Sequence, residues 1–134
     1  MRTLLASAGL ALLLALATEP SASAQEAPEY FKQTLSEQAL KAHWDEQLAV
    51  MNPKGALDGK TKQLIGLAVA AQIPCTYCVS GHTKLAKAAG ATDAQINEAI
   101  ATAALVRFNS TMLQGSGYDL QKFQQEVDRL SAPK

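Results

Sequence analysis

The chain has 134 residues, of which 48% are hydrophobic and 18% charged, a composition that excludes a disordered protein and allows one compact domain. Lysine and arginine together number 12, as do aspartate and glutamate. This neutral balance gives no electrostatic reason to expect nucleic acid or an acidic membrane surface as a partner. Alanine, leucine, glutamine and lysine dominate, and aromatic residues make up only 5%, which favours helix over strand.

The first 24 residues are predicted to form a secretory signal peptide. Arg2 supplies a positive charge, residues 4–17 are apolar, and the Ala-Ser-Ala of residues 22–24 has the small residues of a cleavage site. The apolar stretch is too short to span a bilayer comfortably, and an uncleaved membrane anchor is the alternative. We therefore expect residues 25–134 to form one domain, exported to the periplasm or secreted, with no membrane span after cleavage.

Helical periodicity predicts about five helices with short connections in that domain. They cover residues 36–51, a segment that follows the cap Asp58, residues 75–89, a segment that follows the cap Thr92, and residues 120–130. Pro74 suits the first turn of the third helix, and Gly90 suits its end. Gln95 completes a capping box with Thr92. No stretch shows a convincing strand pattern, so the fold class is predicted to be all-α.

The predicted second helix is apolar on most sides between residues 64 and 71. A helix of this kind is buried in a core or in a subunit interface. A domain of this length has few other residues with which to cover it. We therefore expect oligomerisation to complete the core.

Cys75, Cys78 and His82 carry the chemistry that the sequence predicts. On a helix their spacing places two sulfurs and an imidazole along one face. A helix N-terminus stabilises a thiolate, which is the reactive form of cysteine. A neutral His82 can accept the proton of Cys78, and the second cysteine can convert a sulfenic acid or mixed disulfide into an internal disulfide.

Two other interpretations of the cysteine pair stay open. An exported protein can keep a Cys75–Cys78 disulfide that is structural only, in a helical oligomer without enzymatic activity. The two thiols and His82 also offer three ligands that suit zinc, but the sequence shows no fourth ligand, so we expect no metal. Covalent haem attachment is set aside, because Val79 stands where the motif needs a histidine.

The sequence around the cysteines resembles the alkylhydroperoxidase D-like members of the carboxymuconolactone decarboxylase superfamily. The resemblance covers about residues 57–113 and rests on K-T-K-Q-L-I-G-L-A-V-A at residues 60–70, C-T-Y-C at 75–78, His82, and A-A-G-A-T-D at 88–93. C-x-x-C alone is a weak motif. C-x-x-C-x-x-x-H between an apolar helix and this turn is considerably more specific.

The resemblance implies an all-helical domain that assembles as a trimer or hexamer. It also implies reduction of hydroperoxides or disulfides without a bound cofactor, with electrons from a dithiol donor. Cys78 would match the cysteine that attacks peroxide, Cys75 the resolving cysteine, and His82 the histidine of the proton relay. Decarboxylase members of the superfamily lack this cysteine pair, so a decarboxylase is not expected. Position at the helix end alone favours Cys75 as the attacking residue, whereas the His82 spacing favours Cys78.

Two residues depart from the pattern of the family. Gln63 stands where the relay usually has a glutamate, and a glutamine cannot act as a base at neutral pH. Tyr77 stands where a second histidine is often found, and its hydroxyl is a weak acid. Both departures predict a weakened proton relay, so thiol–disulfide chemistry is a firmer expectation than efficient peroxidase turnover.

Overall fold

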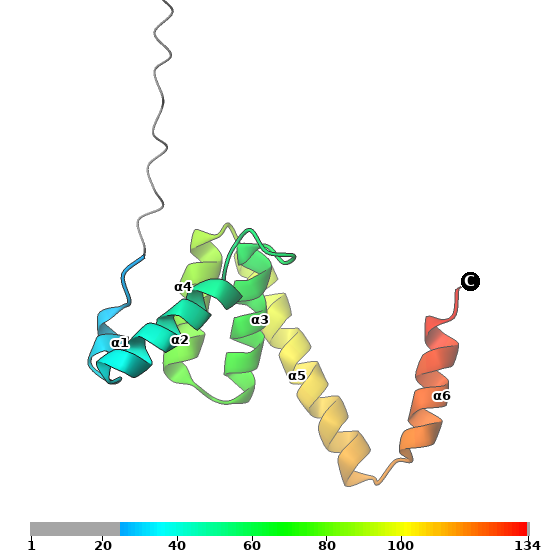
Figure 1. The fold of residues 1–134 in the computed structure, drawn as a ribbon. Coiled ribbons are helices and arrows are strands. Elements are labelled where there is room, and N and C mark those ends of the chain that lie inside the picture. The colour runs from blue at the N-terminus through cyan, green and yellow to red at the C-terminus, as the bar shows by residue number, and fades with distance from the viewer. Residues whose placement is uncertain (1–24, 134) are drawn as a thin grey trace, which may run out of the picture. The chain divides into compact units, whose positions relative to one another are not determined.

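The computed structural model describes residues 25–133, so the predicted signal peptide lies outside the described part of the chain. The helices are α1 (Glu29–Lys32), α2 (Glu37–Val50), α3 (Gly59–Gln72), α4 (Thr76–Ala88), α5 (Asp93–Gly115) and α6 (Leu120–Ser131) (Figure 1). Residues 25–133 form no strand, and one isolated bridge pairs Lys54 with Asp58. The all-α prediction is confirmed. The short helix α1 is an addition, because its four residues are too few to show a helical period.

Two compact units divide the described residues, with a boundary after Trp44 inside α2. In the first unit the Phe31 ring lies against two aromatic rings of α2. The distance between ring centroids is 4.6 Å to His43 and 6.3 Å to Trp44. The second unit begins at Asp45 and contains the end of α2 and helices α3 to α6.

Helix α3 is the centre of the second unit, because it packs against both α4 and α5. The buried core consists of small and aliphatic side chains from these three helices: Leu67, Ala70, Ala86, Ile96 and Ala103. Alanines at the helix contacts let the backbones approach closely. This packing fixes α3 and α4 side by side (Figure 1) and brings His82 of α4 against Gln63 of α3.

Local capping residues fix where the helices begin and end. The Asp58 side chain accepts a hydrogen bond from the Thr61 amide over 2.8 Å at the start of α3. Thr92 and Gln95 form the predicted capping box at the start of α5. Gly90 follows α4 with φ of +84°, a conformation that glycine adopts without steric cost.

The second half of the unit leaves apolar surface uncovered. Helix α5 runs unbroken to Gly115, and α6 packs against no other helix of the described chain. Exposed apolar side chains on α6 are Leu120, Phe123, Val127 and Leu130. Among residues 25–133, no helix has both the length and the apolar character needed to cross a membrane.

Candidate functional site

The two cysteines lie at the start of α4. Cys75 is the N-cap of the helix and Thr76 its first residue, so the helix begins one residue later than predicted and Pro74 precedes the cap. A disulfide joins Cys75 to Cys78, with their Cα atoms 5.2 Å apart. The Sγ atom of Cys75 also accepts a hydrogen bond from the Cys78 amide over 3.2 Å. Both sulfurs therefore lie at the positive end of the helix dipole, where a thiolate is stabilised.

His82 follows Cys78 by four residues, about one turn along α4, and contacts α3. Its Nδ1 atom lies 2.7 Å from Oε1 of Gln63. Gly66 provides the space for the ring, since a Cβ atom at that position would be 2.5 Å from Cε1 of His82. One residue of α3 thus orients the imidazole, and another leaves room for it.

The hydrogen bond and the burial of His82 define its protonation. An amide oxygen can only accept, so Nδ1 carries the hydrogen and Nε2 is left as the acceptor. Partial burial lowers the pKa of His82 below its usual value. The neutral amide of Gln63 offers no charge to offset this effect. At neutral pH His82 is therefore an uncharged base with Nε2 available.

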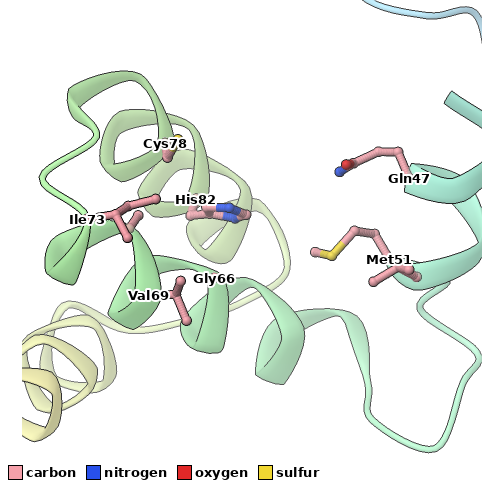
Figure 2. Close-up of a pocket in the computed structure, with 9 residues that line it drawn as sticks. Gln47, Met51, Gly66, Val69, Ile73, Cys78 and His82 are labelled. Carbon is pink, nitrogen blue, oxygen red and sulfur yellow. The ribbon is translucent and has the colours of Figure 1, made fainter. Parts of the chain in front are cut away.

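An apolar cavity of about 300 Å³ adjoins Cys78 and His82. Its lining comes from the end of α2, from α3 and from α4: Gln47, Val50, Met51, Gly66, Val69, Ala70, Ile73, Cys78 and His82. Figure 2 shows the Met51 and Gln47 side chains reaching from the α2 side toward His82. Cys78 lines the cavity and Cys75 does not. A ligand in the cavity would thus meet one sulfur of the pair.

The structure brings together some of the predicted residues and not others. Gln63 contacts His82, as a relay residue would, whereas Tyr77 is 91% exposed and does not line the cavity. Gln47 and Met51, which also line the cavity, were not predicted from the sequence as site residues. Both are far from the cysteines in the chain, and neither belongs to a motif. Their helical spacing with the residues around them carries no signal that distinguishes a cavity wall from ordinary packing.

Arg107 of α5 fixes the end of α3, just before the turn that leads to Cys75. Its Nε donates to the side-chain oxygen of Gln72 over 2.7 Å, and its Nη2 donates to the main-chain oxygen of the same residue over 3.1 Å. The side-chain amide of Gln72 in turn donates to the carbonyl of Ala103 over 2.7 Å. This network links α5 to the segment that carries the cysteines.

Metal binding was one interpretation of the cysteine pair. Within residues 25–133 no group of three or more histidine, cysteine, aspartate or glutamate side chains is placed to hold a metal ion. The thiols that would have supplied two of the ligands are joined to each other in this structure.

Comparisons with known proteins agree with this geometry. The sequence profile of the carboxymuconolactone decarboxylase family matches residues 37–118, more than half of the chain. An uncharacterized protein in the cox locus of Paracoccus denitrificans is 55% identical over 53 residues, which cover 40% of this chain and 48% of that protein. The crystal structure of the alkylhydroperoxidase AhpD core from Rhodospirillum rubrum is similar, with a TM-score of 0.60, 33% identity, and 65% of each chain covered. The chain thus spans about half of the curated relative and less than two thirds of the solved structure.

Proposed function

The chain belongs to the carboxymuconolactone decarboxylase family, and on that basis we propose that it reduces hydroperoxides or disulfides through Cys75 and Cys78. The observation that carries the proposal is the position of Cys78 and His82 on one apolar cavity at the start of α4. The likeness to an alkylhydroperoxidase core supports it. No step requires a bound cofactor.

In the proposed reaction Cys78 attacks as the thiolate, after His82 Nε2 has accepted its proton. The sulfur bonds to the terminal oxygen of the hydroperoxide, the O–O bond breaks, and the proton returns to the leaving alkoxide to give an alcohol. The Cys75 thiol then attacks the sulfenic acid on Cys78, which forms the disulfide and releases water. A dithiol donor, itself oxidised to a disulfide, returns both cysteines to the reduced state.

Gln63 limits the rate of proton transfer to His82 in this scheme. A carboxylate beside Nδ1 would stabilise the imidazolium that forms when His82 takes a proton, and the amide of Gln63 does not. We expect slow turnover with peroxide for this reason. Tyr77 has no assigned role in the scheme, because its side chain points into solvent.

Rapid-mixing measurements with the pre-reduced protein and a hydroperoxide test the proposal. Cys78→Ser should abolish the reaction. Cys75→Ser should still consume one equivalent of peroxide and should leave a sulfenic acid on Cys78 that a dimedone reagent traps. His82→Asn should slow the first step by about 10²-fold or more. Full peroxide consumption by the Cys78→Ser protein would overturn the assigned roles.

The disulfide itself favours a second candidate, a structural bond without redox function. The reduction potential of the pair separates the two. A structural disulfide of an exported protein has a potential below about −300 mV. Such a potential, together with no reaction of the reduced thiols with peroxide, would support the structural role and exclude the enzyme.

We further propose that residues 1–24 direct export and that the protein works in the periplasm or outside the cell as a homo-oligomer. The sequence pattern of residues 1–24 supports export. The exposed apolar faces of the helices support assembly, because contiguous exposed apolar surface usually marks an interface. N-terminal sequencing of the protein from its native host should begin at Gln25. A retained Met1 would contradict the predicted cleavage.

A further inference from the structure

Met51 places a second sulfur in the cavity. It directly follows α2, lines the same cavity as Cys78 and His82, and its side chain reaches toward His82 (Figure 2). The side chain is half-buried, which leaves it open to a ligand in the cavity. The neighbouring walls are the apolar side chains of Val69 and Ile73.

We propose that Met51 is a second site of oxidation, at which a hydroperoxide held in the cavity converts the thioether to methionine sulfoxide once Cys75 and Cys78 are joined. The inference rests on the proposed function only in taking the cavity to receive hydroperoxides. In the disulfide form Cys78 has no thiolate with which to react. Met51 is then the oxidisable sulfur that remains in the cavity wall.

The step balances without another reactant. A lone pair of the Met51 sulfur attacks the terminal oxygen of the hydroperoxide, an S–O bond forms, and the O–O bond breaks. The proton of that oxygen passes to the leaving alkoxide, and His82, which lines the same cavity, can carry it. The sulfur is oxidised by two electrons, and the hydroperoxide is reduced to an alcohol.

The product would change the cavity. A sulfoxide is polar, whereas the thioether that it replaces is apolar. It would set a hydrogen-bond acceptor among Val69, Ile73 and Val50, so that an apolar hydroperoxide binds less well. Excess hydroperoxide would thereby inhibit its own binding in the cavity by oxidising Met51. Methionine sulfoxide reductases can reverse the change.

Met112 is a matched control within the same chain. It lies on α5, does not line the cavity, and is 55% exposed. If accessibility alone decided the rate, Met112 would be oxidised faster than the half-buried Met51. A bound hydroperoxide reverses this order, because binding raises the local concentration of oxidant at one sulfur only.

The experiment uses the purified protein with its disulfide intact, treated with cumene hydroperoxide and, separately, with hydrogen peroxide. Peptide mass spectrometry follows the added oxygen at each methionine over time. With cumene hydroperoxide we expect Met51 to react at least about tenfold faster than Met112, with a rate that saturates as the oxidant concentration rises. With hydrogen peroxide, which has no apolar part to bind, the preference should fall.

Two results would overturn the inference: oxidation of Met112 at an equal or greater rate, or a Met51 rate that stays linear in cumene hydroperoxide. A Met51→Leu protein should show oxidation at Met112 unchanged. Because the cysteines are already oxidised, the outcome does not depend on their turnover. Failure of the proposed function would instead appear as Cys75 and Cys78 that stay reduced when the pre-reduced protein is mixed with peroxide.

Discussion

At Gly66 the backbone of α3 passes directly beneath the imidazole of His82. A methyl group there would come within 2.5 Å of the ring, so Gly66→Ala should push the ring aside. Because the ring is the mobile end of a side chain and alanine is the better helix former, the free energy of unfolding should change by less than about 1 kcal/mol. The rate of peroxide reduction should fall by about 10²-fold, as expected for a displaced catalytic group.

Gly81 provides the control for this substitution. It lies in α4 next to His82, and a Cβ atom there would meet nothing within 4 Å. Gly81→Ala should stabilise the protein by about 0.5–1 kcal/mol and leave the rate unchanged. Chemical denaturation and rapid-mixing kinetics measure the two effects. Equal rates in the Gly66→Ala and wild-type proteins would show that the position of His82 does not matter to the reaction.

Gln63→Glu tests the electrostatics of His82. A carboxylate 2.7 Å from Nδ1 would favour the imidazolium and raise the pKa that burial holds down. NMR titration of the imidazole in the oxidised protein should show a higher midpoint in the variant. In the wild type, the unfolded chain binds the His82 proton more readily than the folded chain does. The free energy of unfolding should therefore fall as the pH falls below about 6.5.

The variant should lose this pH dependence or reverse it, since the raised folded pKa makes protonation favour the folded state. The peroxide rate of Gln63→Glu should also increase. A midpoint that does not move would mean that the contact between Gln63 and His82 is not made in solution.

Sequence spacing was enough to place Cys78 and His82 on one helix with Cys75 at its start, because all three lie within eight residues. It could not place Met51 or Gln47 beside them. Contacts between residues distant in the chain depend on how α2, α3 and α4 pack. The periodicity of the sequence does not reveal that packing. The contact between Gln63 and His82 was anticipated only through the family resemblance.

Lys62 joins two elements that form the cavity. From the first turns of α3 its ammonium donates to the carbonyl oxygens of Val50 and Asn52, each over 2.8 Å. A cation at the C-terminus of α2 satisfies carbonyls that the helix leaves unpaired and suits the negative end of its dipole. Lys62 thereby fixes the end of α2 and the part of the cavity wall that contains Met51.

Lys62→Met should remove both hydrogen bonds and lower the free energy of unfolding by about 1–2 kcal/mol. It should also raise the KM for an apolar hydroperoxide more than it lowers kcat, since the wall moves while the cysteines stay in place. Lys84→Met, an exposed lysine of α4, is the control and should change stability by less than about 0.5 kcal/mol. Equal effects of the two substitutions would exclude this role for Lys62.

At the scale of elements, the helix ends that the sequence predicted correctly are set by local capping residues. The caps Asp58, Thr92 and Gln95 and the glycine after α4 act within one turn of the helix that they limit, so the sequence alone reveals them. The network of Arg107 with Gln72 was not foreseen. It joins residues on two helices through side-chain geometry, which a sequence pattern does not contain.

At the scale of the whole molecule, residues 25–133 bury few apolar side chains and leave many exposed. Helix α6 has Phe123 and Val127 on one face, and no other helix of the described chain packs there. We expect the protein to assemble in solution, with a mass well above 14.2 kDa in analytical ultracentrifugation. Phe123→Lys should shift the protein toward smaller species.

Gln125→Lys is the matched control, because it adds the same charge to α6 on the face opposite the apolar stripe of Leu120, Phe123, Val127 and Leu130. Its sedimentation should equal that of the wild type. A wild-type protein that sediments as a monomer at high concentration would contradict the expected assembly. The sequence predicted that a partner helps to cover the apolar helix of residues 64–71, and it did not predict that α6 would lack a helix packed against it. The number of subunits depends on surface shape.

The sulfur of Cys75 caps α4 by accepting a hydrogen bond from the amide of Cys78. This hydrogen bond makes the first turn of α4 depend on the redox state of the cysteine pair. A thiolate is a stronger acceptor than a disulfide sulfur. Where Cys75 is ionised, the Cys78 amide should therefore exchange its hydrogen with solvent more slowly in the reduced protein than in the oxidised one. A single backbone proton would then report the ionisation of the resolving cysteine.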